Sequence, residues 1–239
     1  MISRINLLKK KEGLSSDEFA TYLMQAHGKL VGTMPHLKGC EANVVVDNEQ
    51  RSPFDRGSTE IDGYTEMVFD SYGDMAHDMA AIGDALSDDY AQFASPDVSA
   101  LVVVKKVDKP VAAYLRDENL IKRMSFLGRK DGVSAAAFQE EWWQMHSALV
   151  KTMTGYAGYN QNLVIDRIVA GESVPFEALP IEGVVEFWFE NMKAFDECYG
   201  TAAFKRTGAH GAEFIDNITT YLVESKPIVA ARSWRAVRG

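Results

Sequence analysis

The sequence feature that most constrains the fold of this chain is a long internal repeat. The segment 134–166 repeats the segment 15–47 at a constant shift of 119 residues. This shift is the distance in sequence between His27 and His146, which occupy the same place in the two copies (146 − 27 = 119). After one inserted residue the shift becomes 120, because Glu182-Gly183 aligns with Asp62-Gly63 (182 − 62 = 120). In a chain of 239 residues, this repeat predicts two halves of about 110–120 residues, each long enough to form its own core.

The predicted elements follow the same order in both halves. Strands are predicted at 4–9, 39–47, 63–69 and 99–107, and again at 121–128, 158–165, 183–189 and 218–224. Helices are predicted at 15–34 and 71–88, and again at 134–152 and 194–204. Polar loops at 48–61 and 167–181 are long for hairpins, so they are expected to cover something. The order is therefore βαββαβ, written twice.

The repeat also sets the domain boundaries. Residues 1–108 form the first half, residues 109–119 a linker that begins with Lys109-Pro110, and residues 120–239 the second half with a C-terminal tail. A short turn is expected near 212–217. Val229 and Trp234 of the tail are expected to pack on the body of the protein.

The predicted fold class is α+β. A βαββαβ unit is a ferredoxin-like split-βαβ arrangement, in which a four-stranded antiparallel sheet carries both helices on one face. The other face is left apolar and has to be covered. Two such sheets facing each other solve this by closing a dimeric α/β barrel within one chain, and a ligand is expected between a sheet and its long loop.

The composition limits the partners of this chain. A net charge of −9 argues against nucleic acid and anionic membrane surfaces, which are bound by clustered lysine and arginine. No apolar run approaches the roughly 20 residues of a membrane span, and the start of the chain lacks the features of a secretory signal. We therefore expect a cytoplasmic protein. Cys40 and Cys198 occupy non-equivalent positions of the repeat, so each is interpreted as a buried thiol.

Two short motifs occur in each half. The first half combines Phe19 and His27 with the strand segment 62–69 (DGYTEMVF), and the second combines Phe138, Trp143 and His146 with the segment 181–189 (IEGVVEFWF). This pattern resembles the EthD-like branch of the dimeric α/β-barrel superfamily, whose fold is ferredoxin-like. The resemblance covers nearly all of the chain except the linker and the tail, and the second half is the closer match.

The resemblance implies a small-molecule enzyme that works without a metal or an organic cofactor. The superfamily includes lactone isomerases, cyclases, decarboxylases, small monooxygenases and some haem-binding enzymes, and in similar lactone methylisomerases the helix histidine handles a substrate proton. We predict a cofactor-independent isomerase or lyase acting on a small lactone or an aromatic-derived acid. The alternatives are a cofactor-free monooxygenase and a non-catalytic accessory module for an oxygenase. A homo-oligomer of such pseudo-dimers is also compatible with the fold.

His146 is the predicted proton-transfer residue, and His27 is the candidate in the other half. An imidazole exchanges a proton near neutral pH when a partner fixes its tautomer. The alternative for each is a buried histidine bonded to a backbone carbonyl. Tyr159 begins the next strand, where its hydroxyl can orient a carboxylate or a carbonyl. Cys40 is its equivalent, and it can act as a nucleophile or an acid only if its pKa is lowered.

Further side chains are candidates for substrate binding. Asn43 and Asn162 recur on an otherwise apolar strand, where each either contacts a polar ligand group or occupies a turn or edge. Of two adjacent tryptophans, Trp142 is expected in the core and Trp143 in the cavity, because neighbours on a helix point about 100° apart. His210, flanked by glycines, is a further candidate.

Two other sets of side chains have more than one interpretation. Glu66 and Glu186 are either solvent-facing or the orienting partners of the histidines. His36 and His77, like His210, lack a matching histidine across the repeat, and no pair of them has the spacing of a metal site. We therefore predict no metal ligands.

Overall fold

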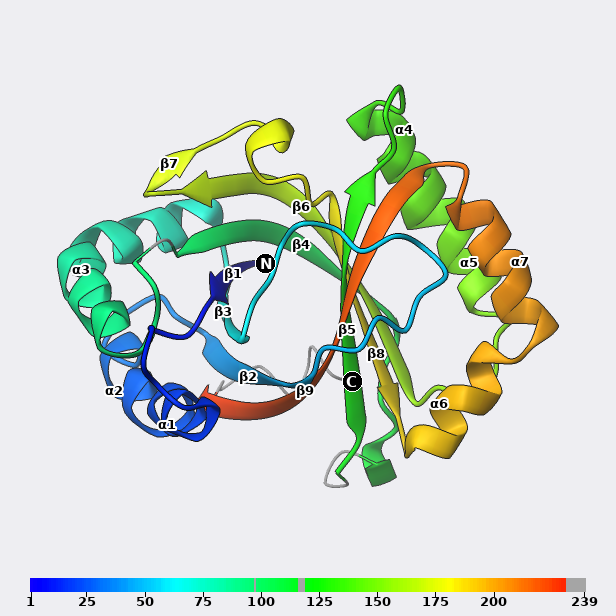
Figure 1. Ribbon diagram of the computed structural model, residues 1–239. Coiled ribbons are helices and arrows are strands. Elements are labelled where there is room, and N and C mark those ends of the chain that lie inside the picture. The colour runs from blue at the N-terminus through cyan, green and yellow to red at the C-terminus, as the bar shows by residue number, and fades with distance from the viewer. Residues whose placement is uncertain (97, 116–118, 231–239) are drawn as a thin grey trace.

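The computed structural model describes residues 1–96, 98–115 and 119–230, and it contains two βαββαβ halves (Figure 1). The first half consists of β1 (Ile2–Leu8), a helix in three parts (α1, Ser16–Thr21; η1, Tyr22–Ala26; α2, His27–Val31), β2 (Gly39–Asp47), β3 (Gly63–Phe69), α3 (Tyr72–Phe93) and β4 (Ser99–Lys109). A short turn, η2 (Ala113–Leu115), follows in the predicted linker.

The second half repeats this order. It consists of β5 (Ile121–Arg129), a helix in three parts (α4, Ala135–Glu140; η3, Glu141–His146; α5, Ser147–Val150), β6 (Gly158–Val169), β7 (Glu172–Ser173), η4 (Phe176–Ala178), β8 (Gly183–Phe189), α6 (Met192–Tyr199), α7 (Ala202–Gly211) and β9 (Ile215–Val229). None of the helices in the described part of the chain is both long and apolar enough to span a membrane.

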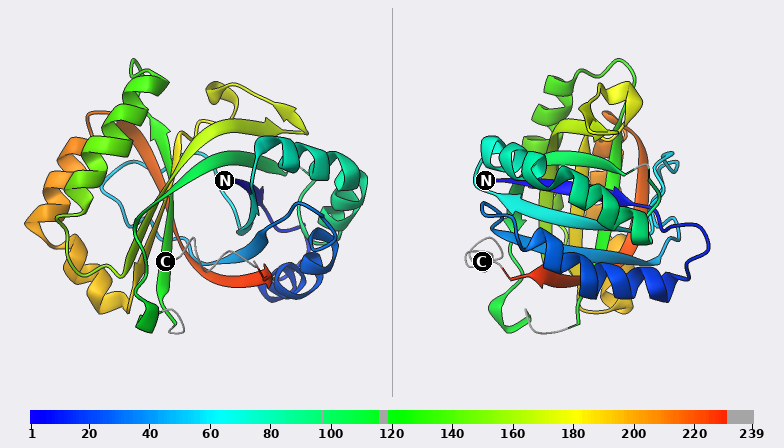
Figure 2. Two further views of the ribbon diagram at one scale, coloured as in Figure 1. Left: turned by 180° about the vertical axis from the view of Figure 1, so that it is seen from behind. Right: turned by 90° about the vertical axis from the view of Figure 1, so that its left-hand side faces the viewer.

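The predicted fold is confirmed, since the strands close into one antiparallel barrel. Strands β4-β1-β3-β2-β9-β5-β8-β6 follow in order, β6 pairs with β4 to close the ring, and β7 is appended to β6. The two halves therefore meet at two seams, β2 with β9 and β4 with β6. Helices α1 to α3 cover one side of the barrel and α4 to α7 cover the opposite side (Figure 2).

Several predicted boundaries differ from the structure. The helix predicted at 194–204 is two helices, because α6 ends at Gly200 and the side chain of Thr201 caps a new helix at the backbone N–H of Phe204. Helix α7 then continues to Gly211 and β9 begins at Ile215, so the turn predicted at 212–217 is shorter. The helix predicted at 71–88 extends to Phe93, and the loop predicted at 167–181 contains β7 and η4.

The tail prediction is tested in part. Val229 is the last residue of β9 and packs against the core of the first half, as expected. Trp234 lies outside the described residues.

A π turn lies at the histidine in the first helix of each half. It spans Tyr22–Ala26, directly before His27, in the first half, and Glu141–His146, which ends on His146, in the second. A π turn inserts one residue into the helical repeat and is frequent at functional sites. It therefore changes the direction in which the following side chains point, and His27, expected at the margin of the buried stripe, is fully buried.

The barrel interior is not the purely apolar space that the pattern predicts. Lys122 Nζ lies 3.0 Å from a carboxylate oxygen of Glu41 and 2.8 Å from one of Glu186, while Lys105 Nζ lies 2.6 Å from Glu66 and 3.1 Å from Glu186. The expectation for Glu66 and Glu186 is therefore wrong. Strand alternation turns both carboxylates into the barrel, where they pair with lysines of other strands rather than with water or a histidine.

The loop between β2 and β3 crosses from the first half onto the second (Figure 1). Gln50 Nε2 donates a hydrogen bond to the carbonyl oxygen of Ile218 at 2.6 Å, and the Ile218 N–H donates to the carbonyl oxygen of Asp55 at 2.9 Å. The loop is thereby fixed to β9 and covers one side of the second half.

Candidate functional site

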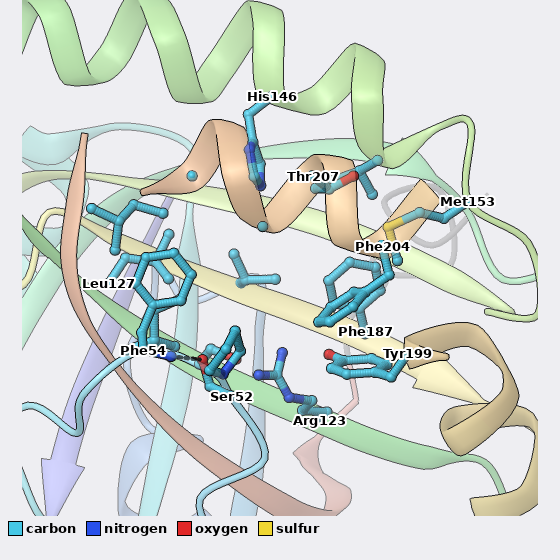
Figure 3. Close-up of a pocket in the computed structure, with 18 of the residues that line it drawn as sticks. Ser52, Phe54, Arg123, Leu127, His146, Met153, Phe187, Tyr199, Phe204 and Thr207 are labelled. Atoms are coloured by element: carbon cyan, nitrogen blue, oxygen red, sulfur yellow. Dashed lines mark hydrogen bonds between the residues drawn. The ribbon is translucent and has the colours of Figure 1, made fainter. Parts of the chain in front are cut away.

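A pocket lies between the sheet and the helices of the second half (Figure 3). It holds about 620 Å³ of space free of protein atoms, including its opening to solvent. Strands β5, β6, β8 and β9 form its floor, η3 and α5 to α7 form its roof, and Ser52 to Phe54 of the crossing loop form one wall. The two halves thus build one pocket together, and a loop of the first half closes the site of the second.

Strand alternation determines the floor of the pocket. Arg123, Ser125 and Leu127 of β5 line it, whereas Met124 between them belongs to the core inside the barrel. Arg123 pairs in register with Phe187 of β8, and Phe187 pairs with Tyr159 of β6. These three side chains therefore form one row across the floor.

The roof carries Trp142 and His146, both from the π turn of the first helix. Trp142 reaches the sheet because residue 183 is glycine, since a Cβ atom at Gly183 would lie 2.6 Å from Cη2 of the indole ring. The ring of His146 extends from the roof toward the floor (Figure 3). Helix α7 passes close to this ring at Gly211, where a Cβ atom would lie 3.3 Å from Cζ of Phe54 and 3.5 Å from Cε1 of His146.

A chain of polar contacts fixes the His146 ring. Its Nδ1 lies 3.3 Å from Nδ1 of His210, and Nε2 of His210 lies 3.2 Å from a carboxylate oxygen of Glu141. A carboxylate only accepts, so His210 carries a proton on Nε2, and when its Nδ1 is unprotonated that nitrogen accepts from His146. His146 consequently donates from Nδ1, which leaves an unprotonated Nε2 without a hydrogen-bond partner among the described residues.

Burial sets the protonation state of His146. Desolvation lowers the pKa of His146 to about 4, and the charge of His210, when that ring is protonated, adds to the lowering. The His146 ring is therefore neutral at pH 7 and has the protonation state that can accept a proton.

Four buried polar atoms of the pocket residues have no hydrogen-bond partner in the described part of the chain. They are Arg123 Nε, Ser125 Oγ, Trp142 Nε1 and Tyr159 Oη. Buried polar groups are nearly always paired, so a cluster of unpaired ones needs an explanation. Each of the four can donate a hydrogen bond. The remaining lining is largely apolar and aromatic, so the pocket suits a flat apolar molecule that carries acceptor oxygens.

The structure brings some of the predicted site residues together. His146 and Tyr159 line the pocket, and His210 contacts His146 from α7. Trp142 is buried in the core of the second half, as predicted, and it also lines the pocket. The prediction for Trp143 is wrong, because its ring lies 5.4 Å from the ammonium of Lys106, away from the lining.

The predicted candidates of the first half lie elsewhere. His27 Nδ1 lies 2.5 Å from Asp89 Oδ2, and its ring stacks on Tyr90 within the core of the first half. Burial raises the pKa of Cys40 well above its ordinary value, so its thiol is not activated as a nucleophile.

The two predicted asparagines face the barrel interior. Lys122 donates to Oδ1 of Asn43 at 3.0 Å, and Asn162 donates to Glu186 at 3.3 Å. Neither side chain lines the pocket, so a role in substrate binding remains a prediction for both.

Sequence reasoning missed Arg123 and Ser125, and it did not foresee that the loop at 48–61, which was expected to cover something, covers the other half. The available signal was a charged residue on a strand at the position equivalent to Arg4 (123 − 119 = 4). What makes Arg123 unusual is the lack of a carboxylate partner among the described residues, and a sequence does not display this.

A possible metal-binding group lies outside the pocket. His36, His77 and Asp78 bring their ligand atoms within 4.8 Å of one another, although the two histidines are 41 residues apart in sequence (77 − 36 = 41). Asp78 already accepts from the His36 N–H at 2.9 Å and contacts the His36 ring at 2.7 Å. This arrangement holds the segment before β2 against α3.

Comparison with known proteins identifies the repeat. The model of the EthD domain matches residues 11–100 and residues 130–218. No curated protein sequence is detectably similar to the chain.

Solved structures with a similar fold cover nearly the whole chain. A candidate monooxygenase from Lactobacillus acidophilus shares 14% identity at a TM-score of 0.55, covering 96% of this chain and 98% of its own. A candidate monooxygenase from Fusobacterium nucleatum shares 8% at a TM-score of 0.60, covering 97% and 94%. An anthrone oxidase-like protein shares 10% at a TM-score of 0.62, covering 95% and 93%. At these identities the likeness extends to the fold alone.

Proposed function

We propose that this chain, which belongs to the EthD family through both of its halves, is an enzyme that abstracts a proton from a small apolar molecule bound in the second-half pocket. The observation that carries the proposal is His146, a neutral imidazole at the pocket whose Nδ1 is engaged and whose Nε2 is free of partners among the described residues. A general base needs this combination of protonation state and fixed tautomer.

The strength of the base limits the substrate. Because the pKa of His146 is about 4, the ring removes only protons that are already acidic, such as a C–H beside a carbonyl or a lactone group. Negative charge then develops on the carbonyl oxygen. Trp142 and Tyr159 supply unpaired donors at the pocket, which is the arrangement that stabilises such an oxyanion.

The fate of the resulting anion determines the reaction class. Reprotonation at another carbon gives an isomerase, and loss of a leaving group gives a lyase. We favour these two outcomes, on a small lactone or an aromatic-derived acid, because each needs no group beyond those that line the pocket. Reaction of the same anion with dioxygen gives a monooxygenase.

Hydrogen–deuterium exchange tests the proposal before the natural substrate is known. A panel of small lactones and aromatic keto acids is incubated with the protein in D₂O, and loss of the acidic C–H signal is followed by NMR. We expect His146→Gln to slow exchange by about 10²–10⁴-fold, the usual contribution of a general base. His77→Gln is the matched control, because its side chain is 65% exposed and far from the lining.

The outcomes of this experiment separate the alternatives. A folded His146→Gln protein that exchanges as fast as the wild type overturns the assignment. Oxygen consumption in an electrode during turnover identifies the monooxygenase. Tight binding of panel compounds without exchange, turnover or oxygen uptake identifies a non-catalytic accessory module.

A further inference from the structure

Arg123 is a buried cation without a carboxylate partner in the described part of the chain. Arg123 is 6% exposed and lines the floor of the pocket. Its Nη2 donates to the carbonyl oxygen of Arg51 at 3.2 Å, its guanidinium lies 5.2 Å from the centre of the Tyr199 ring, and its Nε has no partner. Removing a charge from water without a counter-charge is costly. The cost is offset when an anion binds.

The first half provides an internal comparison for this site. Arg4 and Asn6 occupy the positions of Arg123 and Ser125 in the repeat (123 − 4 = 119; 125 − 6 = 119). Nε of Arg4 donates to Oδ1 of Asn6 at 2.8 Å. In the second half the corresponding atoms, Nε of Arg123 and Oγ of Ser125, are both unpaired. The Nε of the arginine therefore has a hydrogen-bond partner in the first half and none among the described residues in the second.

The same comparison locates the missing carboxylate. Asp166 lies two strands from Arg4: Arg4 pairs with Val102 of β4, and Val102 pairs with Asp166 of β6. Burial lowers the pKa of Arg4, and the charge of Asp166 is among those that oppose this shift. The equivalent aspartate for Arg123 is Asp47 (166 − 47 = 119), which lies two strands away through Leu222.

Asp47 is not available to Arg123. Both of its carboxylate oxygens accept hydrogen bonds from Arg51, at 2.7 Å each. Arg51 thus takes the carboxylate that the repeat would give to Arg123, and its own charge lies close enough to disfavour the charged form of Arg123. Among the described residues that line the pocket, Arg123 is consequently the one that carries a full charge, and it has no carboxylate beside it.

We propose that Arg123, with Ser125 beside it, binds the carboxylate of an aromatic acid in the second-half pocket. The ring of the acid lies among Phe54, Phe187 and Phe204, which line the same pocket (Figure 3). Arg123 enters from the floor and His146 from the roof, so the anionic end of the ligand and the atom that loses a proton lie at opposite ends of the cavity. The inference deepens the proposed function and rests on the same pocket.

Pairs of ligands that differ only in charge test the anchor. Benzoate and 2-naphthoate are compared with benzamide and 2-naphthamide by isothermal titration calorimetry on the full chain. We expect at least one acid to bind at least about tenfold more tightly than its amide, since a charge-assisted bond is stronger than a neutral one. Arg123→Met is expected to abolish this preference, and Arg4→Met, the matched change in the other half, to leave it intact.

Thermal unfolding shows whether Arg123→Met is folded. Arg123→Met removes an unpaired buried charge, so its melting temperature is expected to equal or exceed that of the wild type. Bound acid is expected to raise the melting temperature of the wild type and of Arg4→Met, but not that of Arg123→Met.

The experiments distinguish failure of the carboxylate anchor, Arg123, from failure of the general base, His146. The anchor is overturned if the acids bind no better than the amides, if Arg123→Met keeps the preference, or if none of the four compounds binds. His146→Gln is expected to keep the preference for acids. A preference that depends on Arg123, together with exchange that does not depend on His146, leaves the anchor standing and removes the general base.

Discussion

Nδ1 of His146 lies 3.3 Å from Nδ1 of His210, and the two rings stack with centres 5.6 Å apart. The repeat places His27 against Tyr90 in the same way, with ring centres 5.4 Å apart. Asp89, which binds His27 in the first half, corresponds to Ala209 in the second (209 − 120 = 89). The scaffold is thus shared, while the second histidine lies at a pocket and lacks the carboxylate that contacts His27.

The contact between the two histidines leads to a prediction for the pH dependence of exchange. The rate in the wild type is expected to stay level from neutral pH down to about pH 4 and then to fall, because the pKa of His146 is about 4. His210 contributes to lowering this pKa, so His210→Gln is expected to move the acidic limb to higher pH. The exchange assay measures both profiles. An unchanged limb, or one at lower pH, contradicts the role of His210.

The depressed pKa of His146 also predicts how stability changes with pH. The folded-state pKa of about 4 lies below the ordinary value near 6.5, so the unfolded chain takes up the proton first as the pH falls. The free energy of unfolding therefore decreases as the pH falls from 6.5 to 4, by up to about 3 kcal/mol from this group. Above pH 6.5 this group does not make the stability depend on pH.

Urea unfolding of His146→Gln measures this contribution. The variant lacks the titrating group, so its stability is expected to fall less steeply than that of the wild type over this range. Both proteins share all other titrating side chains, and the difference between their curves isolates His146. Parallel curves would show that the folded-state pKa is not depressed.

The sequence predicts the fold well because the repeat and the strand patterns are local signals. The strands at 39–47, 63–69 and 183–189 have their predicted bounds, and the order βαββαβ is confirmed in both halves. These segments are bounded by glycine or aspartate, and their residues favour strands whatever packs against them. The closure of the barrel then follows from two sheets that each leave one face uncovered.

The site is less predictable because it depends on contacts across the halves. Which of Trp142 and Trp143 faces the pocket is decided by a π turn, which has no reliable sequence signal. Arg123 becomes a candidate only once Asp47 is seen to pair with Arg51. The carboxylates of Glu66 and Glu186 were misinterpreted because the lysines that bind them lie on other strands.

The ion cluster inside the barrel predicts a large effect for Lys122→Met. Lys122 is 2% exposed and contacts Glu41, Glu186 and Asn43. Removing one partner of a buried ion pair leaves charge without its counter-ion, which typically costs about 3–5 kcal/mol. Denaturant unfolding at pH 7 measures the loss.

Lys193→Met is the matched control for this variant. Lys193 pairs with Glu197 on the surface of α6, where its side chain is 83% exposed. An exposed pair contributes little, so no more than about 0.5 kcal/mol is expected to be lost. Equal losses for the two lysines would show that the barrel cluster is not a stabilising network.

Two glycine-to-alanine changes are predicted to have opposite effects on stability. A Cβ atom at Gly83 in α3 meets nothing within 4 Å, so Gly83→Ala gains helix propensity and is expected to stabilise the protein by up to about 1 kcal/mol. A Cβ atom at Gly183 would lie 2.6 Å from Cη2 of Trp142. Gly183→Ala is therefore expected to cost about 1–3 kcal/mol, as overpacking does.

The pocket supplies a second measurement for Gly183→Ala. Trp142 can relieve the clash only by moving away from β8, into the space that it lines above the floor. Aromatic acids are consequently expected to bind more weakly to Gly183→Ala than to the wild type, and with unchanged affinity to Gly83→Ala. A Gly183→Ala protein with wild-type stability and affinity would mean that the indole does not rest on β8, and that the roof of the pocket lies further from its floor.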